Sequence, residues 1–302
     1  MLPALEGYAA ALLGSLDAAS RATVVADLEA VEETVLARGD LRAVLADTSL
    51  TGAIRALVLT DLLSGKVAPV TLRLLTFAAR AVPAQEVARA FAELTQAALR
   101  LHETGALEPT NLGLLEARRR VGGYADALLE DLATGEFATL ESELFAWART
   151  IEGNADLRRL LTDRDAARAA RVEVTDDLLA TRVAPVTAQL ARYVVIGGRP
   201  RDVVGTLDYL VEHIARARDW RVARVHSARS LDASVRASLS SSLSILTGHD
   251  VELQVAEEPD LLGGVLVEVG DLRLDATMRG RLQSLHDEVA AGHFHSSFAP
   301  ND

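Results

Sequence analysis

The feature that most constrains this chain of 302 residues is an internal repeat. Three pairs of similar or identical stretches recur, and the members of every pair are separated by 116 residues. A period of this length exceeds the roughly 20–50 residues of solenoid repeats, so the chain is predicted to contain a duplicated domain. The stretches are GYAAALL at 7–13 with GYADALL at 123–129, DLR at 40–42 and 156–158, and VAPVT at 67–71 and 183–187.

Each copy is predicted to be a bundle of about six helices. Apolar residues recur at intervals of three and four, which is the spacing of one helix face. Pro69 stands at a first helical position, where its missing N–H costs no hydrogen bond, and Gly65 ends the preceding helix. The helices expected in the first copy cover residues 8–16, 24–35, 41–45, 51–63, 69–82 and 83–101, and the second copy repeats this plan.

The last part of the chain changes to the alternating pattern of strands. Val251, Leu253 and Val255 alternate with polar residues, and so do the valines of residues 265–269. Gly270-Asp271 is predicted to form a tight hairpin turn, and Asp275 to cap a closing helix. The fold expected is mainly α, with two tandem six-helix bundles followed by a small α/β C-terminal domain.

These patterns divide the chain into five segments. We expect a first helical bundle, a linker rich in Gly and Pro, a second helical bundle, the α/β domain and a disordered tail. The expected boundaries are 1–105 for the first bundle, 106–122 for the linker, 123–219 for the second bundle, 220–292 for the α/β domain and 293–302 for the tail.

Composition excludes several classes of function. The absence of cysteine excludes a disulfide scaffold, a thiolate zinc site and a cysteine nucleophile. A formal net charge of −12 argues against nucleic acid as the main partner, because phosphate binding relies on cationic contacts. No apolar run approaches the roughly 18 residues that a membrane-spanning helix needs, and no secretory signal precedes the first helix, so the chain is expected to be cytoplasmic.

No known catalytic motif is present, and four weaker candidates each favour a structural interpretation. His293 and His295 could hold a metal but stand alone in the tail, so no metal site is expected. The Arg118-Arg119-Arg120 run is interpreted as a solvated stretch that opens a helix. Gly263-Gly264 precedes a strand rather than a helix, which favours a bend over a phosphate cradle. An ion-paired surface is expected for Arg158, Arg159, Arg164, Arg168 and Arg171.

The C-terminal motif carries a family resemblance. Residues 262–282 (LGGVLVEVGDLRLDATMRGRL) resemble the signature of the F-type ATP synthase delta subunit, whose mitochondrial counterpart is the oligomycin sensitivity-conferring protein. That pattern is a Gly pair, a strand, Gly-Asp, a second strand, Asp-Gly-Ser and a basic helix, and here Ala276-Thr277 replaces Gly-Ser. The motif residues are Gly263, Gly264, Gly270, Asp271, Asp275, Arg279, Arg281 and Leu282.

Two further stretches extend the resemblance over the whole chain. Residues 225–231 (VHSARSL) match the family's strand ending in Ser-Ala-x-x-Leu, and the Tyr-Ala-x-Ala-Leu opening of the family's first helix occurs in both copies. Copy two leads directly into the α/β domain, so it resembles the family's ordinary N-terminal domain. Copy one is then an addition, similar to that of actinobacterial delta subunits. In those the subunit can be fused behind a b-type segment with a membrane helix, and this chain is either the unfused form or one part of such a fusion.

The resemblance implies a stator subunit of the peripheral stalk. In the family the helical bundle grips the N-terminal helix of an alpha subunit, and the α/β domain holds the C-terminal end of a b subunit. The resemblance therefore implies no catalysis and no cofactor, and a place at the cytoplasmic face of the membrane through the complex alone. By analogy copy two binds alpha, and copy one binds a second alpha subunit or braces the stalk. The groove residues implied are Tyr124, Ala127, Leu128, Leu190 and Val194, for which plain bundle core is an equal interpretation.

Three other classes of function remain as alternatives. A helical protein-interaction scaffold or regulator unrelated to ATP synthase would share the bundles but not the C-terminal motif. An enzyme such as a His-dependent hydrolase would show turnover with purified protein. A nucleic-acid-binding helical repeat protein is disfavoured by the negative charge.

Overall fold

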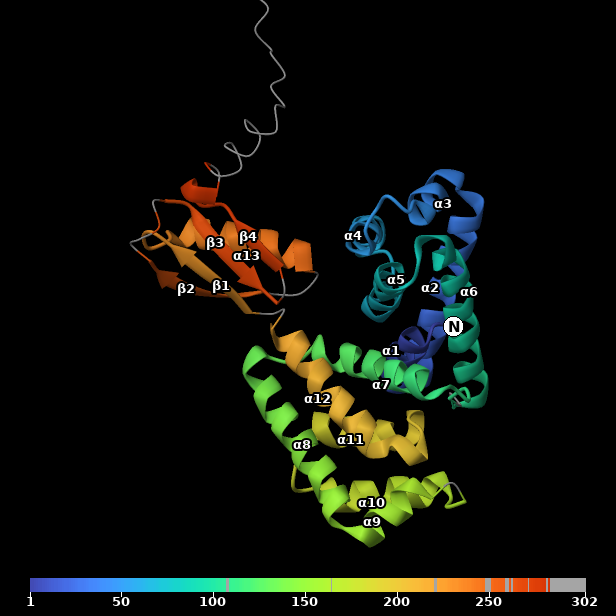
Figure 1. Cartoon of the computed structure of the whole chain (residues 1–302). Coiled ribbons are helices and arrows are strands. Elements are labelled where there is room, and N and C mark those ends of the chain that lie inside the picture. Colours follow the sequence, from blue (N-terminus) through green and yellow to red (C-terminus); the bar gives the residue numbers. More distant parts are fainter. Residues whose placement is uncertain are drawn as a thin grey trace, which may run out of the picture. The chain divides into compact units, whose positions relative to one another are not determined.

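The computed structural model describes residues 1–106, 109–163, 165–219, 222–247, 251–258, 261, 263–270, 272–280 and 282, with only the backbone of Leu36. The described chain forms two compact units, Met1–Ala215 and Arg216–Asp302. The first unit contains both copies of the repeat, and the second contains the sheet (Figure 1). Within what is described, the fold is mainly α with a small α/β part, as the sequence predicts.

The first bundle consists of the helices that the apolar spacing predicts. Pro69 is the first residue of its helix, and Gly65 follows the preceding helix with a left-handed φ of 73°. The elements are α1 (Pro3–Gly14), α2 (Ala18–Ala37), α3 (Gly39–Ala46), α4 (Gly52–Leu63), α5 (Pro69–Ala81), the 3-10 turn η1 (Ala84–Glu86) and α6 (Val87–Thr104).

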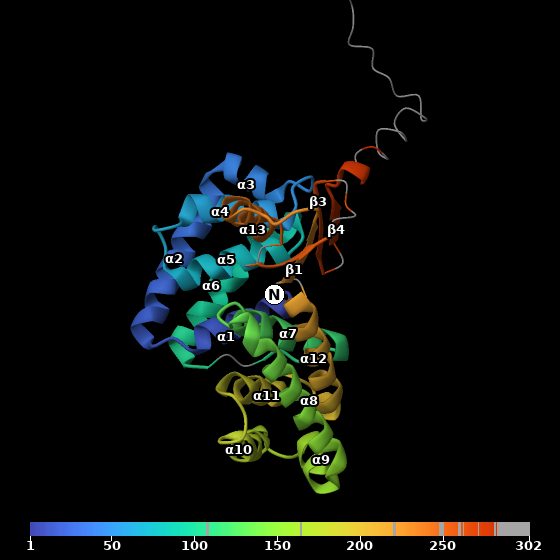
Figure 2. The same cartoon turned by 90° about the vertical axis from the view of Figure 1, so that its left-hand side faces the viewer.

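The second bundle repeats this order of helices. Pro185 again begins the fifth helix of the copy. The elements are α7 (Leu114–Leu129), η2 (Thr134–Glu136), α8 (Phe137–Gly153), α9 (Ala155–Thr162), α10 (Arg168–Leu179), α11 (Pro185–Gly197), η3 (Pro200–Asp202) and α12 (Val203–Asp219). Figure 2 shows the two copies from the side.

The same side-chain contacts hold both copies together. In the first bundle, the carboxylate of Asp27 accepts hydrogen bonds from Ala68 N and Thr71 Oγ1 at 2.7 and 2.9 Å. In the second, Glu143 accepts from Ala184 N and Thr187 Oγ1, which stand 116 positions later. Ring stacks repeat in the same way, with centroids 3.9 Å apart for Tyr8 on Phe77 and 3.7 Å for Tyr124 on Tyr193. The duplication in the sequence is therefore a duplication of structure.

The two bundles meet where their first helices, α1 and α7, pack on each other (Figure 1). A Cβ atom on Gly7 would lie 1.8 Å from the carbonyl oxygen of Arg120. A Cβ atom on Gly123 would lie 1.9 Å from the carbonyl oxygen of Ala4. Gly7 and Gly123 are repeat partners, as are Ala4 and Arg120, so the contact is reciprocal. Only glycine allows the two backbones this close.

The second bundle begins earlier than the sequence predicts. α7 starts at Leu114, so residues 114–122 of the expected linker are helical. Glu116 accepts a hydrogen bond from Gly113 N at 3.1 Å, which satisfies a backbone donor at the helix start. The glycines at positions 122 and 123 do not end the helix, because each one faces a closely packed neighbour there.

The second unit is a four-stranded sheet with one helix between its first two strands. Its elements are β1 (Val222–Ser227), α13 (Ala233–Thr247), β2 (Glu252–Glu257), β3 (Val265–Val269) and β4 (Leu272–Asp275). The strand order is β2-β1-β3-β4, with β1 parallel to β2 and antiparallel to β3. Strands β3 and β4 form the predicted hairpin. The hydrophobic core of the second unit consists of Ala223, Val225, Leu243, Val251, Val267 and Val269.

We expect Gly123→Ala to destabilise the first unit by about 1–3 kcal/mol, because the added methyl group collides with the backbone of α1. Urea denaturation of the whole chain, followed by circular dichroism, measures the change. Gly14→Ala at the end of α1 is the matched control, since nothing lies within 4 Å of its Cβ position. Equal stability of the Gly123→Ala variant and the original chain would contradict the close contact.

Candidate partner-binding surfaces

The five residues expected to grip a partner helix lie on α7 and α11, and most of them are buried. The exposed fractions are 9% for Tyr124, 1% for Ala127, 0% for Leu190 and 1% for Val194. Leu128 is half-buried. Tyr124 Oη accepts a hydrogen bond of 3.0 Å from Gln189 Nε2, which joins the two helices near Leu128. Leu128, Gln189 and the exposed Arg192 therefore form the accessible edge of this helix pair, called here the α7–α11 edge.

Other parts of helix α7 pack against neighbouring helices. Gly122 faces α12, where a Cβ would lie 2.9 Å from Tyr209 Oη. Asp126 Oδ1 lies 2.6 Å from His213 Nε2, and Arg118 forms two hydrogen bonds of 2.7 Å with Asp202. Since α1 covers the Gly123 side, the α7–α11 edge is the accessible surface next to Tyr124 and Leu128.

A polar cluster fixes the end of α7 to the first bundle. Arg73 on α5 donates to the carbonyl oxygen of Ala127 at 2.7 Å and pairs with Glu130 and Asp131 at 2.9 and 3.0 Å. Tyr8 Oη donates to Glu130 at 2.8 Å, and burial together with this carboxylate raises the pKa of Tyr8 far above its usual range. The contacts of this polar cluster were not predicted from the sequence. Arg73 and Glu130 correspond in the repeat to Gln189 and Gly14, so the duplication gave no signal for them.

The Arg118-Arg119-Arg120 run lies inside α7, which begins at Leu114 and not at the run as expected, and only Arg119 of the three is exposed. Arg120 is 3% exposed, and its Nη1 lies 3.0 Å from Glu6 Oε1 in the first bundle. Its Nε donates to the carbonyl oxygen of Gly197 at the end of α11, at 2.9 Å. The interpretation as a solvated stretch was therefore wrong for Arg118 and Arg120. Tertiary contacts pair their charges with carboxylates that are distant in sequence.

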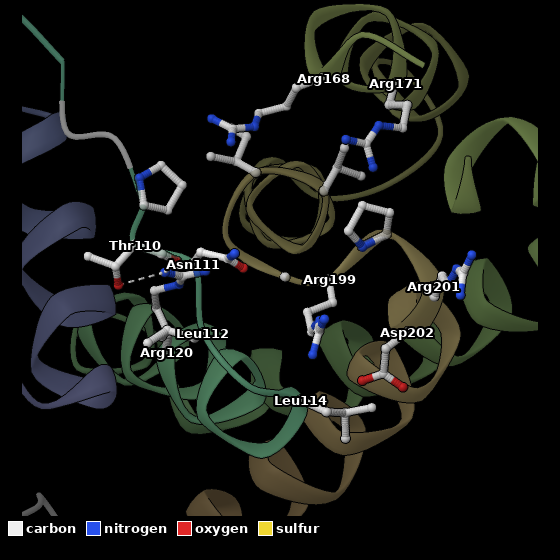
Figure 3. Close-up of a pocket in the computed structure, with 15 residues that line it drawn as sticks. Thr110, Asn111, Leu112, Leu114, Arg120, Arg168, Arg171, Arg199, Arg201 and Asp202 are labelled. Atoms are coloured by element: carbon white, nitrogen blue, oxygen red, sulfur yellow. Dashed lines mark hydrogen bonds between the residues drawn. The ribbon is translucent and has the colours of Figure 1, made fainter. Parts of the chain in front are cut away.

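The expected ion-paired surface is wrong for Arg171. This residue is 6% exposed, and its Nε and Nη1 have no hydrogen-bond partner. Burial and the neighbouring Arg168 lower the pKa of Arg171. Its repeat partner, Arg55, is buried as well but donates to the carbonyl oxygens of Leu50, Ala79 and Val82. The sequence signal for this burial was the arginine at equivalent positions of both copies, Arg55 and Arg171. Arg171 lines a cavity at the end of α11 (Figure 3).

The C-terminal motif forms a compact turn structure in the second unit. Gly264 has a φ of 82°, and a Cβ there would lie 2.3 Å from the carbonyl oxygen of Ala276. The predicted bend at the Gly pair is confirmed. Asp275 accepts hydrogen bonds from Thr277 N and Oγ1 at 2.9 and 2.6 Å, and Gly280 N donates to Thr277 Oγ1 at 3.0 Å. The direct cap is therefore Thr277, which Asp275 positions. Asp271 and Arg281 lie outside the described residues.

Three large apolar side chains of this motif are exposed. The exposed fractions are 38% for Leu274, 50% for Met278 and 58% for Leu282. They come from β4 and from the turn that follows it, while Arg279 between them is exposed as well. Clustered exposed apolar residues with a polar neighbour are typical of protein-interaction surfaces.

The described residues offer no sign of metal chemistry or of a membrane span. They contain no group of three or more His, Asp or Glu side chains that could hold a metal ion. None of the helices described is both long enough and apolar enough to cross a bilayer. His293 and His295 lie outside the described residues, and so does the expected tail at 293–302.

A family model and individual relatives both match this chain to ATP synthase delta subunits. The family model for the ATP synthase delta (OSCP) subunit matches residues 121–289. An ATP synthase subunit delta from Nocardia farcinica is 34% identical over 287 residues, which cover 94% of this chain and 95% of the relative. One from Salinispora tropica is 33% identical over 269 residues, covering 89% of each. The family model begins within α7, so the first bundle lies outside the matched part.

We expect Gly270→Val to destabilise the hairpin by about 1–2 kcal/mol, because Gly270 has a left-handed φ of 56° that β-branched residues avoid. Gly270→Asn is the control, since asparagine tolerates this conformation better. Hydrogen exchange of the β3 and β4 amides in the whole chain measures the loss. Unchanged protection in the valine variant would mean that the turn does not set the hairpin.

Proposed function

The chain belongs to the ATP synthase delta (OSCP) subunit family, and from this membership we propose that it is a non-catalytic stator subunit linking the catalytic head to the peripheral stalk. The observation that carries the proposal is a match to delta subunits over 94% of the chain at 34% identity. In this role the protein holds the head still while the rotor turns, so that proton-driven rotation is coupled to ATP synthesis. It acts at the cytoplasmic face of the membrane, through the complex alone, without a cofactor.

The head contact is proposed for the second bundle. The partner is the N-terminal helix of an alpha subunit, laid along the α7–α11 edge with its apolar face toward Leu128 and Tyr124. Two observations support this choice: the family model covers the second bundle but not the first, and neighbouring helices cover the Gly122 and Gly123 sides of α7. Ala127, Leu190 and Val194 are buried in the bundle core. They support the α7–α11 edge by packing and do not contact the partner.

The stalk contact is proposed for the second unit. The partner is the C-terminal end of a b or b-like subunit, packed on the exposed side chains Leu274, Met278 and Leu282. These side chains belong to the residues that carry the family motif. Burying the exposed half of one such side chain would contribute about 1 kcal/mol to binding, so the three together can anchor a stalk helix.

Leu128→Arg should weaken binding of an alpha N-terminal peptide to the whole chain by tenfold or more, because a charged end replaces the apolar contact. Calorimetric titration measures the affinity, and circular dichroism checks that the variant folds. Leu115→Arg is the matched control on the same helix, where Leu115 is 64% exposed and lies off the edge. Equal affinity of the Leu128→Arg variant and the original chain would exclude this edge. If the original chain does not bind the peptide, the head contact itself is wrong.

Met278→Lys should reduce binding of the soluble part of a b subunit by tenfold or more, since lysine cannot be desolvated without cost in an apolar interface. Sedimentation velocity of the mixture measures complex formation. Leu57→Lys in the first unit serves as the control, because Leu57 is 52% exposed, close to the 50% of Met278. A Met278→Lys variant that binds the stalk normally would place the contact elsewhere.

A further inference from the structure

The cavity at the end of α11 is unusually cationic for so acidic a protein. It has a volume of about 410 Å³ and lies within the first unit, between α10, η3 and the segment before α7. Its charged lining residues are Arg120, Arg168, Arg171, Arg199, Arg201 and Asp202. The single carboxylate, Asp202, is already paired with Arg118. The volume falls in the range of roughly 300–1,000 Å³ that is usual for small-molecule sites.

Arg171 is the residue that makes this cavity a built site. The residue is only 6% exposed, and its buried Nε and Nη1 atoms donate to nothing. Among the residues that the structure describes, no ion pair is formed by Arg171, Arg199 or Arg201. A buried cation without a partner costs free energy, and a ligand that supplies acceptors would recover that cost.

The repeat provides a direct comparison for Arg171, because its partner Arg55 is buried but satisfied. In the first bundle, Arg55 uses the carbonyl oxygens at the end of α5. In the second bundle, Arg120 donates to the carbonyl oxygen of Gly197 at the end of α11, a position that corresponds to Ala81 and not to an acceptor of Arg55. The position equivalent to Arg120 in the first copy is Ala4, which cannot make such a contact. The Nε and Nη1 atoms of Arg171 make none of the backbone contacts that satisfy Arg55.

The geometry points to a binding site for a small oxyanion at the Arg171 guanidinium, in a cavity that Arg168 and Arg199 also line. Figure 3 shows Arg168 and Arg171 reaching from α10 and Arg199 and Arg201 following the end of α11. Guanidinium groups bind phosphate and carboxylate in a bidentate manner, so both groups share the required chemistry. This site lies apart from the edge proposed for the alpha helix, and it does not depend on that proposal.

Calorimetric titration of the whole chain with pyrophosphate and, separately, with citrate tests the site at constant ionic strength. We expect one anion to bind per chain. Binding of pyrophosphate alone assigns the site to phosphate groups, binding of citrate alone assigns it to carboxylates, and binding of both assigns it to oxyanions in general. The absence of heat and of any thermal shift with either anion, up to millimolar concentration, overturns the proposal.

Arg171→Met should lower the anion affinity about 10- to 100-fold, because it removes charge-assisted hydrogen bonds. Without anion, the same change should raise the unfolding midpoint, since it removes an unpaired buried charge. Arg55→Met is the matched control at the equivalent position, and it should lower the midpoint while leaving anion affinity unchanged. Anion binding that survives in Arg171→Met, or that is lost equally in Arg55→Met, contradicts the site.

Arg199→Ala provides a second test of the anion site in case the Arg171→Met variant does not fold. Arg199 is exposed, so its truncation should leave the unfolding midpoint unchanged. We expect the anion affinity to fall severalfold, and the effect to shrink as salt screens the charge. An affinity unchanged in this variant would exclude the cavity mouth as part of the binding site.

Discussion

The reciprocal contact between α1 and α7 is the constraint on which the first unit depends. Gly7 meets the backbone of Arg120, and Gly123 meets that of Ala4, at distances that leave no room for a Cβ atom. Because the backbones come this close, the middle of α7 is buried, and α7 packs against α1, α11 and α12. The polar clusters of Arg73 and Arg120 then close the two ends of the contact with charge-assisted hydrogen bonds. Two bundles joined in this way form one compact unit, which suits a subunit proposed to resist torque.

Several contacts inside each bundle are the same in both copies, whereas the residues that join the two copies differ. In both copies a carboxylate, Asp27 or Glu143, accepts a hydrogen bond from the backbone N–H just before the fifth helix. A stacked pair of aromatic rings is also present in both copies. The residues that join the copies differ between them. Arg120 replaces Ala4 and Arg73 replaces Gln189, so each copy contributes a different half of the interface. The copies also differ at the equivalent arginines Arg55 and Arg171, because Arg55 donates to backbone carbonyl oxygens while Nε and Nη1 of Arg171 have no partner.

The arrangement also separates the proposed contacts. The accessible α7–α11 edge belongs to the first unit, and the exposed side chains of Leu274, Met278 and Leu282 belong to the second. A stator needs separate attachments for head and stalk, and the division into two compact units provides one surface on each. Most of the expected groove residues are core instead, since a helix from the same chain covers α7.

The sequence by itself determined the duplication, the helical character of both copies, the hairpin at Gly270 and the family, because each of these depends on local spacing or on a contiguous motif. The start of α7 was missed, because Gly122 and Gly123 resemble a linker when the close packing that requires them is unknown. Only the tertiary structure decided that Arg120 and Arg171 are buried and that one is paired while the other is not. The physical reason is that burial and ion pairing are set by residues distant in sequence, such as Glu6 and Gly197, whose approach no local pattern encodes.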